Sequence, residues 1–135
     1  MKKIKLLLFT LLFIVFTACS TYRTVIPTGV YQIQSIACPE KIYIGSSTMI
    51  PERYYGHLNK LKLNKHSNSK LQKHYNTYGK NDLIFSIIML VDEDDLIVTE
   101  QFYIDELKPF FNERDAINKL NRKEKRLYNK LMKSN

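Results

Sequence analysis

A single glutamate lies on the apolar face of a helix predicted in the second half of the chain. Leu96, Glu100, Tyr103 and Leu107 recur at helical spacing, so Glu100 falls on the stripe that faces the core. A carboxylate on an apolar face is costly unless it is paired or bound to a cation. Divalent cations such as Mg²⁺ are often held by one or two carboxylates together with water and a substrate phosphate. Glu100 is therefore a candidate metal ligand, and a buried pairing with an Arg or a Tyr is the alternative.

A basic row follows one side of an earlier predicted helix. Arg53, His57 and Lys60 recur at i, i+4 and i+7, beside the predicted core stripe rather than on it. Arg can grip a phosphate through two parallel hydrogen bonds, so this row suits the edge of a phosphate-binding cleft. A solvated charged face is the alternative. His66 precedes the next helix and could exchange a proton near neutral pH, whereas His74 lies among polar residues predicted to be exposed and is given no role.

Two tyrosines stand beside glycines in short strand-like segments, Gly29-Val30-Tyr31 and Tyr43-Ile44-Gly45. A free tyrosine has a pKa of about 10. Either phenol could act as a base only if nearby Arg, Lys or metal charge lowered its pKa. Packing in the core is the alternative for both.

Composition indicates one small basic domain. The chain has 135 residues and a formal net charge of +8, which suits a polyanionic partner such as nucleic acid or an anionic membrane surface. Its only cysteines, Cys19 and Cys38, form neither a disulfide framework nor a zinc-ligand pattern.

The N-terminus has the pattern of an export signal. Three lysines precede an apolar run at residues 6–18, which is shorter than the ~20 residues of a membrane-spanning helix. The run ends in Ala18-Cys19-Ser20, which resembles a bacterial lipoprotein signal. We therefore expect a signal peptide at 1–18, a lipidated Cys19 and an exported lipoprotein anchored in the membrane. An ordinary signal peptide, an uncleaved anchor and a cytoplasmic location are the alternatives.

Local patterns predict the elements that must position the candidate side chains. In chain order they are strands at 30–36 and 42–44, a helix from Pro51, a helix capped by Ser67 or Asn68 and ended by Gly79, a strand at 83–90, a helix from the acidic run 92–95 to Leu107, and a basic amphipathic helix at 113–135. The almost unbroken apolar run 83–90 is typical of a central strand buried on both faces. The fold class is α+β, with a small three-stranded antiparallel sheet flanked by helices and followed by the basic helix.

Taken in order, these motifs resemble the GIY-YIG nuclease family, especially the phage-type homing endonucleases. The segments that carry the resemblance are the two signatures at 29–31 and 43–45, the arginine helix at 52–57, the histidine loop at 66–72, the glutamate helix at 100–104 and the asparagine segment at 109–112. Val30 replaces the usual Ile, and Tyr103 stands where Trp is common. The resemblance spans about residues 28–112, which we expect to form the catalytic domain, with residues 19–27 as a tether.

The resemblance implies a metal-dependent endonuclease that hydrolyses DNA phosphodiester bonds. The implied catalytic residues are Tyr31, Tyr43, Arg53, His57 and His66; the implied metal ligand is Glu100, holding Mg²⁺ or Mn²⁺; and the implied substrate-binding residues are Asn112 and Lys60. Within this set Tyr31 would be the general base, Tyr43 would support it, and Arg53 would stabilise the transition state. The short basic helix leaves little room for a recognition module, so we expect low sequence specificity.

Two other classes of function remain open from the sequence. The first is a nucleic-acid-binding lipoprotein that has lost catalysis, although retention of Tyr31, Arg53 and Glu100 together argues against it. The second is an envelope protein that lays its basic C-terminal helix on anionic lipid. That reading leaves the two tyrosine signatures and Glu100 unexplained.

Overall fold

The computed structural model describes residues 26–133. The predicted signal peptide 1–18, the lipidation site Cys19 and most of the tether lie outside the described residues. Within 26–133, none of the helices has both the length and the apolarity needed to cross a bilayer.

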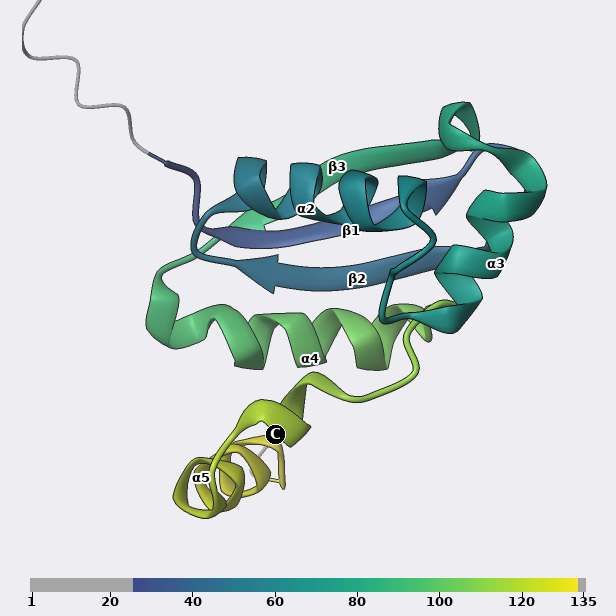
Figure 1. Cartoon of the computed structure of the whole chain (residues 1–135). Coiled ribbons are helices and arrows are strands. Elements are labelled where there is room, and N and C mark those ends of the chain that lie inside the picture. The colour runs from purple at the N-terminus through teal and green to yellow at the C-terminus, as the bar shows by residue number, and fades with distance from the viewer. Residues whose placement is uncertain (1–25, 134–135) are drawn as a thin grey trace, which may run out of the picture.

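Three antiparallel strands form one sheet with the order β2-β1-β3. The strands are β1 (Gly29–Ser35), β2 (Ile42–Ser47) and β3 (Leu83–Leu90), and β1 pairs with both neighbours. The expected α+β class with a three-stranded antiparallel sheet and flanking helices is confirmed (Figure 1).

The expectation that residues 83–90 form a central strand was wrong. β3 is an edge strand, and several of its apolar side chains are about half exposed, namely Ile84, Ile87, Met89 and Leu90. The central position belongs to β1, which is more polar in sequence but is largely buried. β2 pairs with one edge of β1 and β3 pairs with the other edge, so β1 is the strand with a neighbour on both sides.

Residues 26–133 contain four α-helices, whose ends follow local sequence signals. They are α2 (Ile50–Lys62), α3 (Ser69–Tyr78), α4 (Leu96–Leu107) and α5 (Arg122–Lys133), with 3₁₀ turns at Lys80–Asp82, Glu93–Asp95 and Ala116–Lys119. α5 lies beyond α4, away from the sheet (Figure 1). Asn68 caps α3, because its side-chain oxygen accepts the backbone N–H of Leu71 at 2.8 Å. Lys108 ends α4 in a left-handed conformation (φ 45°), just before Pro109.

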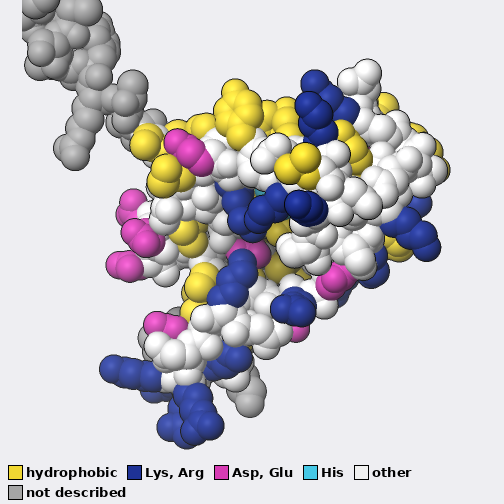
Figure 2. Space-filling model, in the orientation of Figure 1, with side chains coloured by type: hydrophobic (Ala, Val, Ile, Leu, Met, Phe, Trp, Pro, Cys, Tyr) yellow, Lys and Arg dark blue, Asp and Glu magenta, His cyan; other side chains and the backbone are white. Residues whose placement is uncertain are grey.

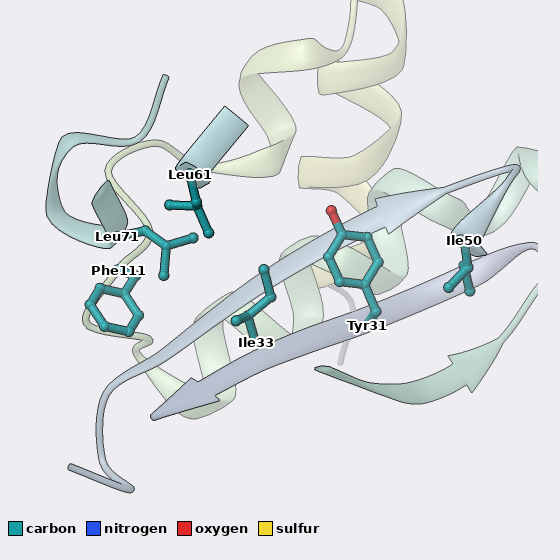
Figure 3. Packing of buried hydrophobic residues seen from close by; sticks show 6 residues of the cluster. All are labelled: Tyr31, Ile33, Ile50, Leu61, Leu71 and Phe111. Carbon is teal, nitrogen blue, oxygen red and sulfur yellow. The ribbon is translucent and has the colours of Figure 1, made fainter. Parts of the chain in front are cut away.

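The core is divided between the two faces of the sheet. On one face α2 and α3 cover the apolar side chains of β1, and this cluster contains Tyr31, Ile33, Ile50, Leu61, Leu71 and Phe111 (Figure 3). On the other face Val30 and Ile44 pack against Ile104 of α4 and Ala116. Successive residues of β1 point to opposite faces, so Val30 and Tyr31 belong to different clusters.

Residues 113–121 do not belong to one continuous C-terminal helix, as the sequence had led us to expect. A loop and the 3₁₀ turn Ala116–Lys119 come first, and α5 begins only at Arg122. Ala116 is buried, and the backbone N–H of Ile117 donates to the Gln101 side chain at 2.9 Å. These contacts fix the turn on α4 and keep this segment from continuing as a helix.

Two details of the predicted burial also change. On α4 the buried stripe is completed by Ile104, whereas Leu107 is about half exposed at the end of the helix. His74 was expected to be exposed, but it is buried, and its Nε2 lies 2.7 Å from Asp82 Oδ2. Burial favours a higher pKa for Asp82, but hydrogen bonds from His74, Ser35 and the Ala37 backbone outweigh it and hold that pKa below its ordinary value. This network ties the end of β1 to the turn before β3.

Candidate active site

One cleft of about 700 Å³ collects most of the residues singled out from the sequence. It lies between α2, the end of β2, the loop before α3, α4 and the segment that follows α4. The predicted residues that line it are Tyr43, Arg53, His57, Lys60, His66, Glu100 and Asn112. Tyr31 is fully buried beneath it and is joined to it by hydrogen bonds. Lys and Arg side chains gather around the middle of the face shown in Figure 2 and continue over α5.

The Tyr31 side chain reaches from the central strand to the floor of the cleft. Its ring stacks on Phe85, with centroids 4.6 Å apart, which fixes its orientation. Its oxygen lies 2.8 Å from His57 Nε2 and accepts a hydrogen bond from Arg53 Nε at 3.1 Å. Tyr43 lies beside it, with a ring-centroid distance of 6.3 Å. The two signature tyrosines therefore meet, although only Tyr31 is held by two nitrogen donors.

Gly45 makes room for this pair. It lies directly opposite Tyr31 in the β1–β2 register, and a Cβ atom there would fall 2.6 Å from the Tyr31 oxygen and 2.9 Å from the Tyr43 ring. We expect Gly45→Ala to displace both rings and to destabilise the fold by about 1–3 kcal/mol through overpacking. Urea unfolding of the purified variant measures this loss.

Gly56→Ala on α2 is the matched control, since a Cβ at Gly56 meets no atom within 4 Å. It should leave the fold intact or raise its stability by about 0.5–1 kcal/mol, because Ala is the better helix former. Equal stability of the two alanine variants would contradict the packing argument for Gly45.

Two histidines form a directed chain of hydrogen bonds that ends on Tyr31. The backbone N–H of Asn68 donates to His66 Nδ1 at 3.0 Å, so a neutral His66 carries its proton on Nε2. His66 Nε2 then donates to His57 Nδ1 at 2.7 Å. A neutral His57 must therefore carry its proton on Nε2 and donate to the Tyr31 oxygen. This direction favours the phenolate form of Tyr31.

The electrostatics keep the histidines neutral. Burial and the nearby Arg53 charge lower the pKa of His57 to about 3. Burial also lowers the pKa of His66. His57 is buried on α2, so the expectation that it lies beside the core face was wrong. Arg53 and Lys60, on the same helix, are exposed as expected.

The two tyrosines are held in the neutral form in the absence of further positive charge. Burial, followed by the neighbouring Tyr43, raises the pKa of Tyr31, while Arg53 opposes the shift. Burial, followed by the Glu100 carboxylate, raises the pKa of Tyr43. A cation held by Glu100 would remove part of this penalty.

Glu100 is buried with its carboxylate at the cleft wall, as its position on the apolar stripe predicts. It is 3% exposed, and its oxygens accept hydrogen bonds from Ser46 Oγ at 2.5 Å and from Lys119 Nζ at 2.6 and 2.8 Å. Within residues 26–133 no three His, Cys, Asp or Glu side chains come together as a metal cage. A single carboxylate that already binds an ammonium in an open cleft fits a Mg²⁺ ion, which takes its other ligands from water and phosphate.

Lys119 is a cleft residue whose pairing with Glu100 the sequence did not reveal. It follows Glu100 by 19 positions in a segment rich in basic residues, and no spacing distinguishes it from the other lysines. It lines the cleft and pairs with Glu100, so the partner of this buried carboxylate is a lysine and not the Arg or Tyr that we expected as the alternative.

Asn112 supports β2 from outside the sheet. Its side-chain oxygen accepts the Ile44 N–H at 2.8 Å, and its amide donates to the Ile44 carbonyl at 2.9 Å. The oxygen and the NH₂ of the side-chain amide thus both hold β2 at Ile44, between Tyr43 and Gly45. This geometry suits a residue that positions the site, and contact with substrate stays a prediction.

Two motif tyrosines, an arginine and a buried glutamate meet at one cleft, and similarity to endonucleases makes the class of protein a nuclease. The sequence matches the GIY-YIG catalytic domain over residues 27–121. This match covers most of the chain, which therefore belongs to the GIY-YIG catalytic domain family.

Individual relatives agree with this membership. The chain is 34% identical over 89 residues to Intron-associated endonuclease 1 of Enterobacteria phage T4, a match that covers 63% of this chain and 35% of that protein. It thus spans about a third of that relative's length. Two solved structures of the catalytic domain of the intron endonuclease I-TevI, one of them a point mutant, are each 31% identical. The mutant gives a TM-score of 0.61 over 66% of this chain and 95% of that domain; the other gives 0.60 over 65% and 99%.

Proposed function

We propose that this protein is a metal-dependent endonuclease that hydrolyses DNA phosphodiester bonds with low sequence specificity. The observation that carries the proposal is the convergence of Tyr31, Arg53 and Glu100 on one cleft. The phage relative is an endonuclease, which supports the same reaction.

Tyr31 is the general base in this proposal. Its oxygen accepts hydrogen bonds from Arg53 and from the neutral histidine chain. Both bonds favour the phenolate form of Tyr31, which is the base that activates water. Tyr43 lies beside it at the cleft wall, where it can orient that water.

Arg53 and Glu100 act on the scissile phosphate. Arg53 lines the cleft and its Nε holds Tyr31, so one side chain links the base to the charge that builds up in the transition state. A Mg²⁺ or Mn²⁺ ion on Glu100 would neutralise phosphate charge and stabilise the leaving oxygen. Ser46 holds the carboxylate in place for that purpose.

The net charge of +8 and the basic side chains beside the cleft favour nucleic acid as substrate. Lys60, Arg114 and Lys119 line the cleft together with acidic residues, and basic side chains continue over α5. Contacts of this kind go to phosphates, give salt-sensitive affinity and carry no sequence information. Low sequence specificity follows for the described part of the chain.

The experiment is a plasmid-cleavage assay with purified protein. We expect supercoiled plasmid to be nicked or linearised with Mg²⁺ and to remain intact with EDTA. Arg53→Ala, purified in the same way, controls for contaminating nucleases and should cut at least about 10²-fold more slowly.

The inactive nucleic-acid-binding lipoprotein is the competing outcome of this assay. Salt-sensitive DNA binding by the wild-type protein, without metal-dependent cutting, would establish it and overturn the proposal. Export and lipidation of Cys19 stay predictions from the sequence. They are tested by comparing the wild-type protein with Cys19→Ser in cells, where the variant should lose its association with the membrane.

A further inference from the structure

The ion pair between Glu100 and Lys119 occupies the carboxylate that the proposed metal needs. Lys119 Nζ lies 2.8 Å from one Glu100 oxygen and 2.6 Å from the other, and Ser46 donates to the second. The Glu100 side chain is 4% exposed, whereas that of Lys119 is 54% exposed. The ammonium thus caps a buried carboxylate from the solvent side, where a cation entering from the cleft would arrive.

The segment that carries Lys119 is anchored independently of this ion pair. Ala116 packs into the core cluster with Val30, Ile44 and Ile104, and the Ile117 N–H is bonded to Gln101. Lys119 ends the same 3₁₀ turn. Its backbone is therefore held in place, and only its long, half-exposed side chain has to move for the ammonium to leave the carboxylate.

The Lys119 ammonium and a Mg²⁺ ion cannot both bind the two Glu100 oxygens closely. Mg²⁺ binds carboxylate oxygens at about 2.0–2.1 Å, and an ammonium at hydrogen-bond distance from both oxygens would lie close to that ion. Repulsion between like charges disfavours the doubly occupied state. A buried carboxylate without any cation is also disfavoured, since it loses its solvation without compensation.

We propose that Lys119 is an internal cation that holds Glu100 in the metal-free protein and competes with the divalent metal for it. This inference rests on the proposed metal-dependent function. Lys119 keeps the carboxylate paired, and it lowers the apparent metal affinity until the metal displaces the ammonium towards solvent.

The test measures Mn²⁺ binding by isothermal titration of EDTA-stripped, purified full-length protein. Lys119→Met removes the ammonium and keeps the length of the side chain, so Mn²⁺ should bind about tenfold more tightly. Lys119→Arg keeps the charge and should bind Mn²⁺ as weakly as the wild type. Lys60→Met is the matched control, because it removes the same charge from the same cleft without touching Glu100.

Thermal unfolding in EDTA provides a second readout. Lys119→Met should melt several degrees below the wild type because Glu100 is left buried without a cation, and Mn²⁺ should raise its melting temperature by more than that of the wild type. Lys60→Met should show neither change.

Three results would overturn the inference. The first is unchanged or weaker Mn²⁺ binding in Lys119→Met. The second is an equal gain in Lys60→Met, which would show a general effect of cleft charge. The third is no Mn²⁺ binding in any of the proteins. Plasmid cutting by the wild type separates the two proposals: if it cuts with Mg²⁺ and Lys119→Met shows no gain in affinity, competition fails while the nuclease function stands.

Discussion

Glu100→Gln should abolish metal-dependent DNA cleavage while leaving the fold and DNA binding intact. We expect a loss of roughly 10³-fold, equivalent to about 4 kcal/mol of transition-state stabilisation, because a neutral amide is a poor ligand for Mg²⁺. The amide oxygen can still accept the Ser46 hydrogen bond, and the released Lys119 ammonium is already half exposed to water. Initial rates of plasmid nicking measure the loss of cleavage. Fluorescence anisotropy measures DNA affinity, and the melting temperature checks that the fold is intact.

Glu52→Gln is the matched control for the lost negative charge. Glu52 lines the same cleft from the first turn of α2, but it is exposed. We expect this variant to cut within about threefold of the wild type, since an exposed charge has only a weak influence in water. A Glu100→Gln variant that cuts within tenfold of the wild type would rule out Glu100 as the essential metal ligand.

Much of the fold could be predicted because its signals are local. The β1–β2 hairpin, the Asn68 cap and the ends of α3 and α4 each depend on residues within a few positions of one another. The position of β3 depends on which of the two open hairpin edges it joins, that of β1 or that of β2, and this is a long-range choice. An apolar run such as 83–90 has the same composition in a central strand and in an edge strand with exposed apolar residues, so its sequence alone could not decide.

The candidate site shows the same division. Glu100 could be found because a carboxylate interrupts an apolar stripe, and Tyr31 and Arg53 because they stand in recognisable motifs. Burial of His57 depends on the packing of α2 over β1, where the Tyr31 oxygen accepts a hydrogen bond from its ring. Lys119 could not be found, because only its long-range contact with Glu100 distinguishes it from the basic residues near it in the sequence.

Tyr31→Phe should lower the cleavage rate by about 10²–10⁴-fold, the usual contribution of a general base. Phe keeps the stacking on Phe85 and fills the same buried space, so the fold should persist. The His57 Nε2–H loses its acceptor in a buried position, which we expect to cost about 1–3 kcal/mol of stability. Single-turnover cleavage of a labelled duplex, together with urea unfolding, separates the loss of rate from the loss of stability.

The pH dependence distinguishes a base from a structural hydroxyl. Burial raises the pKa of Tyr31, so only a small fraction is ionised at neutral pH, and this fraction grows as the pH rises. The wild-type rate should therefore increase with pH from about 6.5 to 8.5, whereas the residual rate of Tyr31→Phe should lose this dependence. The histidine chain should add no acidic limb from His57, since its pKa of about 3 leaves it neutral throughout this range.

Tyr43→Phe is the matched control, because it removes the other signature phenol and leaves the Tyr31 oxygen with both of its donors. We expect a smaller loss of rate and an unchanged dependence on pH. If Tyr43→Phe instead removed the pH dependence while Tyr31→Phe kept it, the base would be Tyr43. The directed hydrogen bonds on Tyr31 would then serve to hold Arg53 in place for the phosphate, and the geometry of the site would need no phenolate at Tyr31.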